Sequence, residues 1–348
     1  MIEHTEYPFY VGTYTNGDSQ GIYQYVLHKD GKLEGIGLAA NSENPSFLAI
    51  SNNKKYLVAI NEINHSGEGT VESFLISENT LGFISRTSSG GAHPCFVAIN
   101  ESGYVLTANY TGGNVGLLKL NSSGSLSKIL DLQQHYGNGG TERQKSPHAH
   151  SVWFQPNSSK VISIDLGTNE LIFSQLDKET NKLISTEQNN IKMSNGAGPR
   201  HLVFHPNGKC FFVANELNST VTQIKIIEDG KYERSVISST LPTNFTESNT
   251  CADIHISSDG NFLYASNRGH NSIAIFKIDK NNGTLNLLGH ESTRGDGPRS
   301  FSLSPDDSFL VVANQQTNNI ISFKRDKKTG LLKFASEIDA PTPVCILF

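Results

Sequence analysis

The chain has 348 residues and a formal net charge of −5, and 18% of its residues are charged. This mild acidity argues against a general nucleic-acid binder, and no apolar run approaches the roughly 20 residues that a membrane-spanning helix needs. The first residues lack a basic region followed by an apolar one, so we expect no secretory signal and a cytoplasmic protein. The four cysteines are widely spaced and form no CxxC pair, which favours buried thiols over disulfides or a zinc site.

A strand–turn–strand pattern recurs along the whole chain. In chain order, its second strands end at Thr13, Asn61, Asn109, Asp165, Asn215, Asn267 and Asn314. The steps of 48, 48, 56, 50, 52 and 47 residues, by subtraction, are too long for one hairpin and are typical of a four-stranded propeller blade. A third strand, such as residues 272–278, follows each copy, and a more polar fourth strand comes after it. The repeat therefore predicts seven blades.

The first blade is divided between the two ends of the chain. Residues 9–13 and 21–27 supply its second and third strands, and the apolar segment 344–348 supplies its inner strand. Pairing these segments leaves no exposed apolar strand edge. We therefore predict an all-β fold, a seven-bladed β-propeller of four-stranded antiparallel blades, as one domain over residues 1–348.

Two alternatives and one irregularity qualify this architecture. A row of small β-sandwich domains would have a similar repeat, but units of about fifty residues are too short to close a core each. The sequence also lacks a Trp-Asp signature, which weighs against a WD40 propeller. The longest departure from the repeat is the polar, Gly-rich insertion at residues 135–145, before the inner strand of the fourth sheet.

In a propeller, the loops that enter the inner strands and leave the second strands open on the same face, toward the central channel. Directly before the inner strands we place Ser46, Cys95, His150, Arg200, Ala252, Arg299 and Val344. Directly after the second strands we place Tyr14, Glu62, Tyr110, Leu166, Glu216, Arg268 and Gln315. Any one of these charges is explained as a solvated loop residue, but several at one mouth favour a binding site, and arginines there suit a carboxylate or phosphate.

Two histidines, His148 and His150, form a His-x-His pair just before the fourth inner strand. Such a pair can ligate a metal, with Glu62 or Glu216 as a third ligand. We prefer the interpretation that one imidazole acts as a base or hydrogen-bond donor, because histidine titrates near neutral pH. Two structural histidines in a loop are the third alternative.

Other polar residues of the repeat are interpreted as structural. They are His201, His205 and His255, and the asparagines that end the second strands, whose side chains bond nearby backbone in turns. Asp165 and Leu166 depart from the repeat, and we expect them to make their sector of the mouth less polar. No serine-nucleophile elbow, phosphate-binding loop or dinucleotide fingerprint is present.

Seven short motifs extend over the whole chain: GTYT at 12–15, AHP at 92–94, PHAHS at 147–151, GPRH at 198–201, ANE at 214–216, SNRGH at 266–270 and GPRS at 297–300. Together they resemble the seven-bladed propeller lactonases, the bacterial 6-phosphogluconolactonase family that also contains the fungal carboxy-muconate cyclases. The resemblance implies a seven-bladed propeller that opens the lactone ring of 6-phosphoglucono-δ-lactone in the oxidative pentose phosphate route. In the muconate-cyclising relatives a histidine, two arginines and a glutamate are proposed for the site, and they match His150, Arg200, Arg268 and Glu216.

We therefore expect a lactonase in which a water attacks the carbonyl, with Glu216 or His150 as the base and Arg200 and Arg268 stabilising the oxyanion. The expected substrate-binding residues are His148, Arg299, Glu62, Tyr14 and Tyr110. We expect no metal and no redox cofactor, a small anionic sugar lactone as the partner, and no nucleic acid or membrane; the sequence identifies no protein partner. A muconate-type cycloisomerase and a non-catalytic ligand- or protein-binding propeller are the alternatives.

Overall fold

The computed structural model describes residues 6–227 and 230–348. The expectation that the N-terminus carries no secretory signal falls on residues 1–5, which lie outside this described part. The chain divides into two compact units, which are residues 39–200 and residues 1–38 together with 201–348. The expectation of a single domain stays a prediction.

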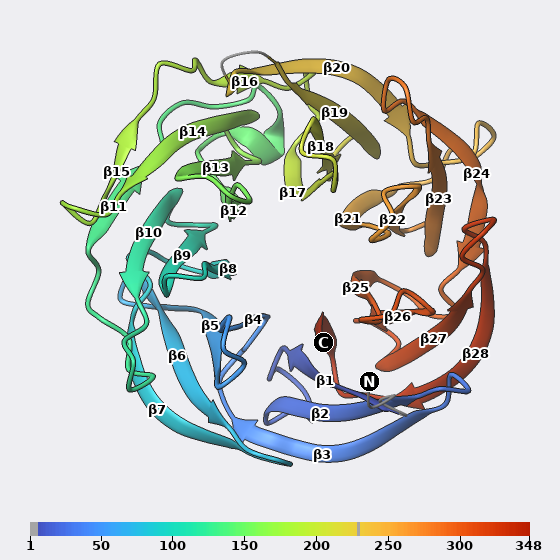
Figure 1. Ribbon diagram of the computed structural model, residues 1–348, viewed down its shortest axis with the longest axis horizontal. Helices are drawn as coiled ribbons and strands as arrows, with labels where there is room; N and C mark the ends of the chain where they lie inside the picture. Colours follow the sequence, from blue (N-terminus) through green and yellow to red (C-terminus); the bar gives the residue numbers. More distant parts are fainter. Residues whose placement is uncertain (1–5, 228–229) are drawn as a thin grey trace. The chain divides into compact units, whose positions relative to one another are not determined.

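The chain forms seven antiparallel sheets of four strands, one of them with a short fifth strand, which confirms the predicted seven-bladed β-propeller (Figure 1). Within residues 39–200 the sheets consist of β4 (Phe47–Ile50), β5 (Tyr56–His65), β6 (Glu68–Ile76) and β7 (Leu81–Ser88); of β8 (Pro94–Ile99), β9 (Tyr104–Asn109), β10 (Asn114–Lys119) and β11 (Asp131–Gln134); and of β12 (Ala149–Phe154), β13 (Lys160–Asp165), β14 (Glu170–Asp177) and β15 (Lys182–Ser185), with β16 (Ile191–Lys192) beside β14. Among the described residues the one helix is the short 3₁₀ turn η1 (Glu142–Gln144).

The other unit contains the remaining sheets, and β3 and β17 cross the boundary between the units. Its sheets consist of β17 (Pro199–Phe204), β18 (Cys210–Asn215), β19 (Thr220–Ile226) and β20 (Tyr232–Ser239); of β21 (Thr250–Ile256), β22 (Phe262–Arg268), β23 (Ser272–Ile278) and β24 (Leu285–Ser292); of β25 (Pro298–Leu303), β26 (Phe309–Asn314), β27 (Asn319–Arg325) and β28 (Leu332–Asp339); and of β29 (Pro343–Leu347), β1 (Glu6–Thr13), β2 (Gly21–His28) and β3 (Leu33–Asn41).

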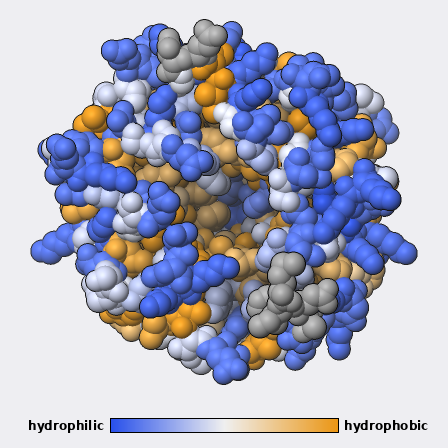
Figure 2. Space-filling model, in the orientation of Figure 1, coloured by the Kyte–Doolittle hydropathy of each residue, from blue (hydrophilic) through white to orange (hydrophobic). Residues whose placement is uncertain are grey.

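The second strand of a blade is buried on both faces. All six residues of β9, β18 and β26 are buried, so these strands are nearly continuous apolar runs. The fourth strands, such as β20 and β28, carry mostly exposed or half-buried side chains. The face in Figure 2 is accordingly mostly hydrophilic, with apolar side chains in small groups between polar ones. No helix in the described part of the chain has the length and apolar character to cross a bilayer.

The terminal strand β29 completes the first sheet, as predicted. It pairs antiparallel with β1, with Val11 opposite Ile346 and Tyr10 opposite Leu347, and Figure 1 shows the two strands side by side. Ile346 is buried in one apolar cluster with Val11 and Phe309. This pairing joins the two ends of the chain in one sheet.

Two second strands end later than predicted: β22 by one residue, at Arg268, and β5 by more. The repeat places the end of the second strand of the second blade at Asn61, but β5 continues to His65 and β6 pairs with it as far as His65 opposite Glu68. The register shifts between Asn61 and His65, so the hairpin extends past an irregularity that the sequence alignment does not show. Glu62 consequently lies within a strand and not in a loop.

We expect the terminal strand to be essential for stability. Deleting residues 344–348 removes the buried side chains of Val344, Cys345 and Ile346 and exposes the edge of β1. Since each large buried apolar side chain contributes about 1.5–3 kcal/mol, the free energy of unfolding should fall by about 5 kcal/mol or aggregation should follow. Denaturant unfolding and solubility measure this effect.

A milder variant makes the same test if the truncated chain does not fold. Ile346→Ala should cost about 2–4 kcal/mol, whereas Leu331→Ala, at a side chain that is 48% exposed, should leave the free energy of unfolding nearly unchanged. Equal stability of all these proteins and the wild type would contradict the role assigned to β29.

Candidate functional site

Three inner strands contain a β-bulge at the residue that the sequence places just before them. His150 lies within β12, where the register with β13 shifts between Ala149 and Ser151. Arg299 in β25 and Cys95 in β8 occupy the corresponding places in their sheets. The predicted starts of these three strands are therefore late by two residues, because each strand begins before the bulged residue and continues after it. A bulge takes a residue out of the hydrogen-bonded ladder and redirects its side chain.

An ion pair joins Arg268, at the end of β22, to Glu216, directly after β18. Arg268 Nη2 lies 3.0 Å from Glu216 Oε2, and the two side chains are 18% and 7% exposed. The same nitrogen donates to the backbone carbonyl of Cys251 at 3.0 Å. Burial lowers the pKa of the Arg268 guanidinium, the Glu216 carboxylate raises it, and the charge of Arg299 lowers it further. Arginine nonetheless stays protonated, so the pair holds a desolvated cation against a carboxylate.

Arg299 adds a second cation to this group. Its Nη2 donates to Tyr14 Oη at 2.7 Å, and its guanidinium carbon lies 5.3 Å from the centroid of the Tyr14 ring. We call Tyr14, Glu216, Arg268 and Arg299 the Arg268 cluster; all four belong to the unit of residues 1–38 and 201–348. With two guanidiniums and one carboxylate, the cluster has a net positive charge, which suits an anionic ligand.

Three residues within 39–200 form a second group, which we call the Tyr110 cluster: Tyr110, His148 and His150. The His148 ring stacks on Tyr110 with centroids 4.5 Å apart and planes at 10°, and the His150 ring meets Tyr110 edge-on at 5.5 Å. His148 Nδ1 lies 3.0 Å from the Tyr110 carbonyl oxygen. A carbonyl only accepts, so Nδ1 carries the proton, and a neutral His148 presents a lone pair on Nε2.

His150 and Arg200 are both buried, at 4% and 3% exposure. His150 Nδ1 lies 3.7 Å from Cys95 Sγ, and that thiol also contacts the His150 carbonyl oxygen at 3.3 Å. The hydroxyl of Ser151 donates to the Arg200 carbonyl at 2.7 Å. The segment that carries His150 is therefore attached to the backbone at Arg200.

Glu62 is held by its own blade. Its Oε2 accepts a hydrogen bond from Ser46 Oγ at 2.5 Å, and its backbone N–H donates to the Asn44 carbonyl at 3.0 Å. These contacts bring together two positions that the blade alignment selects, Ser46 before the inner strand and Glu62 after Asn61.

The asparagines at the ends of the second strands make local hydrogen bonds, to backbone carbonyls in four blades and to the hydroxyls of Thr220 and Thr222 at Asn215, which agrees with their structural interpretation. Asn109 Nδ2 donates to the Ser89 carbonyl at 3.0 Å, and Asn314 Nδ2 donates to the Thr293 carbonyl at 2.9 Å. In each case the carbonyl belongs to the segment that leads into the inner strand of the same blade. The asparagine thus fixes that segment against the end of the second strand.

Asp165 occupies this corner position in the β12–β15 sheet and makes contacts that the sequence analysis missed. Its buried carboxylate accepts from His135 Nδ1 at 2.7 Å and from the backbone N–H groups of His148 at 2.8 Å and Thr168 at 2.7 Å. Burial alone would raise the pKa of Asp165, but His135 and the backbone donors hold it below its ordinary value. The sequence predicts that Asp165 and Leu166 make their sector of the mouth less polar. This expectation fits only Leu166, which is fully buried. The available signal was an aspartate where five other blades have asparagine.

A second buried carboxylate, Asp253, lies between two histidines that were predicted to be structural. Its Oδ1 lies 3.0 Å from His201 Nδ1 and its Oδ2 lies 3.3 Å from His255 Nε2. The backbone N–H of Phe301 donates to the same Oδ2 at 3.2 Å. Burial would raise the pKa of Asp253, but the two histidines hold it well below its ordinary value. These contacts agree with structural roles for His201 and His255.

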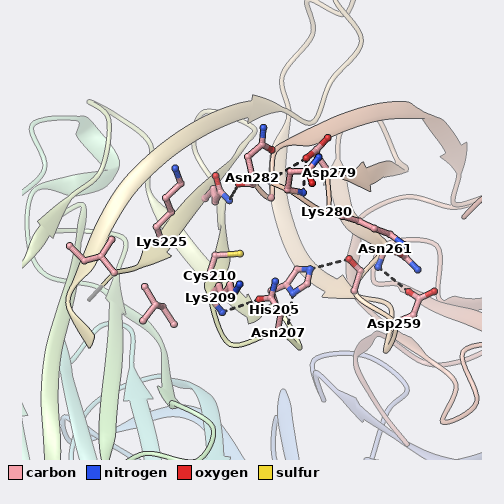
Figure 3. Close-up of a pocket in the computed structure, with 16 residues that line it drawn as sticks. His205, Asn207, Lys209, Cys210, Lys225, Asp259, Asn261, Asp279, Lys280 and Asn282 are labelled. Atoms are coloured by element: carbon pink, nitrogen blue, oxygen red, sulfur yellow. Dashed lines mark hydrogen bonds between the residues drawn. The ribbon is translucent and has the colours of Figure 1, made fainter. Parts of the chain in front are cut away.

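A pocket of about 560 Å³ lies among turns of residues 205–283 (Figure 3), and among the described residues none of those predicted for the site lines it. Its carboxylates are used within their own turns, since Asp259 accepts from the backbone N–H of Asn261 and Asp279 from that of Asn281. His205 Nε2 donates to the Gly260 carbonyl at 3.1 Å. The pocket therefore gives no reason to prefer it to either cluster as a candidate for the functional residues.

The His-x-His pair has no metal-binding partner group in the described part of the chain. No three side chains of histidine, cysteine, aspartate or glutamate gather there in a way that could hold an ion. The Nδ1 atoms of His148 and His150 contact different groups, a backbone carbonyl and a thiol. The acid–base interpretation of the pair stays a prediction.

Comparison with known proteins agrees with this architecture. Residues 8–348 match the family model described as lactonase, 7-bladed β-propeller. The chain is 36% identical to the 6-phosphogluconolactonase of Bacillus subtilis over 302 residues, 85% of each chain, and 35% identical to that of Formosa agariphila over 84% of this chain and 85% of the relative. A solved structure, the periplasmic gluconolactonase of Pseudomonas aeruginosa, superimposes with a TM-score of 0.93 at 27% identity over 98% of both chains.

Replacing Asp253 with asparagine should destabilise the protein most at neutral pH. Folding lowers the pKa of Asp253, so the ionised carboxylate stabilises the folded protein at pH values above about 4, the ordinary pKa of an aspartate. This stabilisation is lost as the pH falls toward the lower pKa of Asp253 in the folded protein. At pH 7 the variant should lose about 3 kcal/mol, since the buried His201 and the half-buried His255 lose their charged partner. The difference in the free energy of unfolding between the variant and the wild type should become smaller below about pH 4.

Denaturant unfolding at pH 7, 5 and 3.5 checks this dependence. Asp18→Asn removes a carboxylate from an exposed turn and serves as the control, with little change at any of the three pH values. A loss of stability in Asp253→Asn that is equal at all three pH values would show that the charge of Asp253 does not matter.

Proposed function

Because the chain belongs to the seven-bladed β-propeller lactonase family, we propose that it hydrolyses 6-phosphoglucono-δ-lactone to 6-phosphogluconate, a step of the oxidative pentose phosphate route. Two relatives carry the name 6-phosphogluconolactonase, which supports the phosphorylated substrate. One solved structure is named a gluconolactonase, so the unphosphorylated lactone is the appropriate comparison substrate.

The Arg268 cluster is the observation that carries this proposal. It presents two guanidiniums beside a single carboxylate, and Arg268 is largely removed from water. Lactone hydrolysis develops negative charge on a carbonyl oxygen, and a fixed cation in a poorly solvated place stabilises that charge without reorganising. An ordinary surface arginine would have neither the burial nor the fixed partners, which are Glu216 and the Cys251 carbonyl.

The proposed reaction adds one water to the lactone. A base takes a proton from the water while its oxygen bonds to the carbonyl carbon, and the former carbonyl oxygen becomes an oxyanion. The bond from that carbon to the ring oxygen then breaks, and the ring oxygen receives a proton to become a hydroxyl. The product is a carboxylate, and no electrons are transferred, so the reaction requires no redox cofactor.

Four residues are proposed as catalytic. Arg200 and Arg268 stabilise the oxyanion, and either Glu216 or His150 takes the proton from water. The substrate-binding residues of the proposal are Tyr14, Glu62, Tyr110, His148 and Arg299. The Nε2 lone pair of His148 can accept from a substrate hydroxyl, because its Nδ1 is occupied by the Tyr110 carbonyl.

Substitution of the proposed catalytic residues should reduce turnover strongly. Arg200→Ala or Arg268→Ala removes one donor to the oxyanion, which typically costs ~100- to 1000-fold in kcat. Glu216→Gln and His150→Gln separate the two candidate bases, and the residue that acts as the base should lose ~100-fold or more. Steady-state hydrolysis of 6-phosphogluconolactone, corrected for the spontaneous reaction, measures these effects.

Thermal melts beside the kinetics show that each variant is folded at the assay temperature. Lys192→Ala removes an exposed cation, 83% exposed at its side chain, and should keep wild-type turnover. Near-wild-type kcat in all four active-site variants would contradict the proposed roles. A wild-type protein that binds the lactone but never exceeds one equivalent of product would indicate a non-catalytic binding propeller.

We also expect turnover to be independent of added metal. The two imidazoles of the His-x-His pair contact separate protein groups, and neither oxyanion stabilisation by arginine nor a side-chain base requires an ion. Dialysis against a strong chelator should leave kcat/KM within about twofold of the untreated enzyme. Loss of turnover that a divalent ion restores would show that the pair ligates a metal.

A further inference from the structure

The Gly-rich insertion 135–145 is fastened to the blade at both of its ends. At its start, the His135 imidazole forms a buried pair with Asp165, with side-chain exposures of 3% and 0%. At its end, the fully buried Gln144 donates from Nε2 to the Leu166 carbonyl at 2.8 Å. A Cβ at Gly139 would lie 2.7 Å from the Gln144 side chain, so the loop passes close to that side chain. Specific buried contacts therefore hold the insertion in place at both ends.

The anchor of this insertion also holds the candidate site. The Asp165 carboxylate that binds His135 accepts the backbone N–H of His148 at 2.8 Å through its other oxygen. At the corresponding corners of other blades, a neutral asparagine bonds the incoming segment. An aspartate can bind a histidine and a backbone N–H at once, because an ionised carboxylate has only acceptor sites. Asp165 therefore couples the insertion to the segment that carries His148.

Arg143, in the turn η1, extends from the insertion to the Tyr110 cluster. Its Nη2 donates to Tyr110 Oη at 3.2 Å, and the ring of Tyr110 stacks on His148. Arg143 is exposed. The insertion thus places a solvent-accessible guanidinium beside two proposed substrate-binding residues, Tyr110 and His148.

We propose that Arg143 is a specificity-determining residue that binds the anionic group of the substrate, and that the His135–Asp165 pair positions it. A guanidinium binds a phosphate through two parallel N–H donors, which gives it a geometric preference for a phosphorylated ligand over a neutral one. The inference rests on the proposed lactonase function and deepens it, because it assigns recognition of the phosphate to the insertion. Asp165 and His135 act through Arg143 and His148 and are positioning residues.

The test compares two lactones that differ in the phosphate. Initial rates are measured for 6-phosphogluconolactone and for unphosphorylated gluconolactone, and the readout is the ratio of their kcat/KM values. The wild type should prefer the phosphorylated lactone. Arg143→Gln should lower this ratio by ~10-fold or more, mainly through the KM of the phosphorylated lactone, and Arg143→Lys should restore part of it because it keeps the charge.

Lys145→Gln is the matched control, because it removes the same charge from an exposed position of the same insertion. It should leave the ratio of the two lactones unchanged. An Arg143→Gln enzyme that keeps the wild-type ratio, or a Lys145→Gln enzyme that loses it to the same extent, would overturn the assignment to Arg143.

Asp165→Asn tests the positioning pair. Asparagine is the residue at five of the other corners, so we expect the variant to fold, and a thermal melt checks this. Without the charged partner of His135, the ratio should fall toward that of Arg143→Gln, and the double variant should lower it no further. A folded Asp165→Asn enzyme with the wild-type ratio would overturn the positioning role.

The failure of this inference is distinguishable from the failure of the proposed function. A wild type that hydrolyses neither lactone above the spontaneous rate would disprove the lactonase proposal and, with it, the assignment of Arg143. A wild type that hydrolyses both lactones with equal kcat/KM would retain the lactonase proposal and overturn the phosphate-binding role alone.

Discussion

Burying a guanidinium costs free energy because its charge loses water, and at Arg268 the protein offsets this cost with a carboxylate and a backbone carbonyl. The pair with Glu216 is 3.0 Å long and mostly buried. Buried ion pairs contribute little net stability, since desolvation cancels much of their attraction, and apolar side chains of similar size often stabilise as much or more. The proposed catalytic role therefore accounts for the pair better than a role in folding does. A cation held in place by fixed partners is ready for an oxyanion before the substrate arrives.

Other buried charges of the chain serve folding and show the contrast. Asp253 is enclosed by two imidazoles and two backbone N–H groups, and all four donate to it. Asp165 has a similar set of donors but connects a Gly-rich insertion to the segment of His148. The same arrangement, a carboxylate surrounded by donors, thus joins strands of three sheets at Asp253 and fixes part of the candidate site at Asp165. The difference lies in what each carboxylate holds: strand residues in β17, β21 and β25 for Asp253, and an insertion for Asp165.

Much of the fold could be predicted because the repeat itself encodes it. Buried second strands are apolar runs, turn residues separate them, and their spacing of about fifty residues defines a blade. The same alignment placed Glu216 and Arg268 at equivalent positions, and the structure joins them in an ion pair. Aligning the blades matches equivalent positions along the chain, but it does not reveal where a strand contains an extra residue. The bulges at His150 and Arg299 were missed for that reason.

The contacts of the insertion could not be predicted either, because residues 135–145 have no counterpart in other blades. His135 and Asp165 are thirty positions apart, and nothing in their local sequence indicates that they meet. Arg143 was likewise read as part of a polar loop, since its contact with Tyr110 depends on how the loop folds back. Only Asp165 stood out in the sequence, as a charged residue at a corner position where five other blades have asparagine. Its role became clear once the structure showed its contact with His135.

We propose that the Arg268–Glu216 pair serves catalysis at some cost to stability. The most direct test is the double variant Glu216→Gln with Arg268→Met, which removes both charges together and leaves no uncompensated buried ion. Its thermal midpoint and its turnover of 6-phosphogluconolactone are measured beside the wild type. The account predicts a midpoint equal to or above that of the wild type and a loss of turnover of ~100-fold or more. A variant that loses stability but keeps its turnover would contradict it.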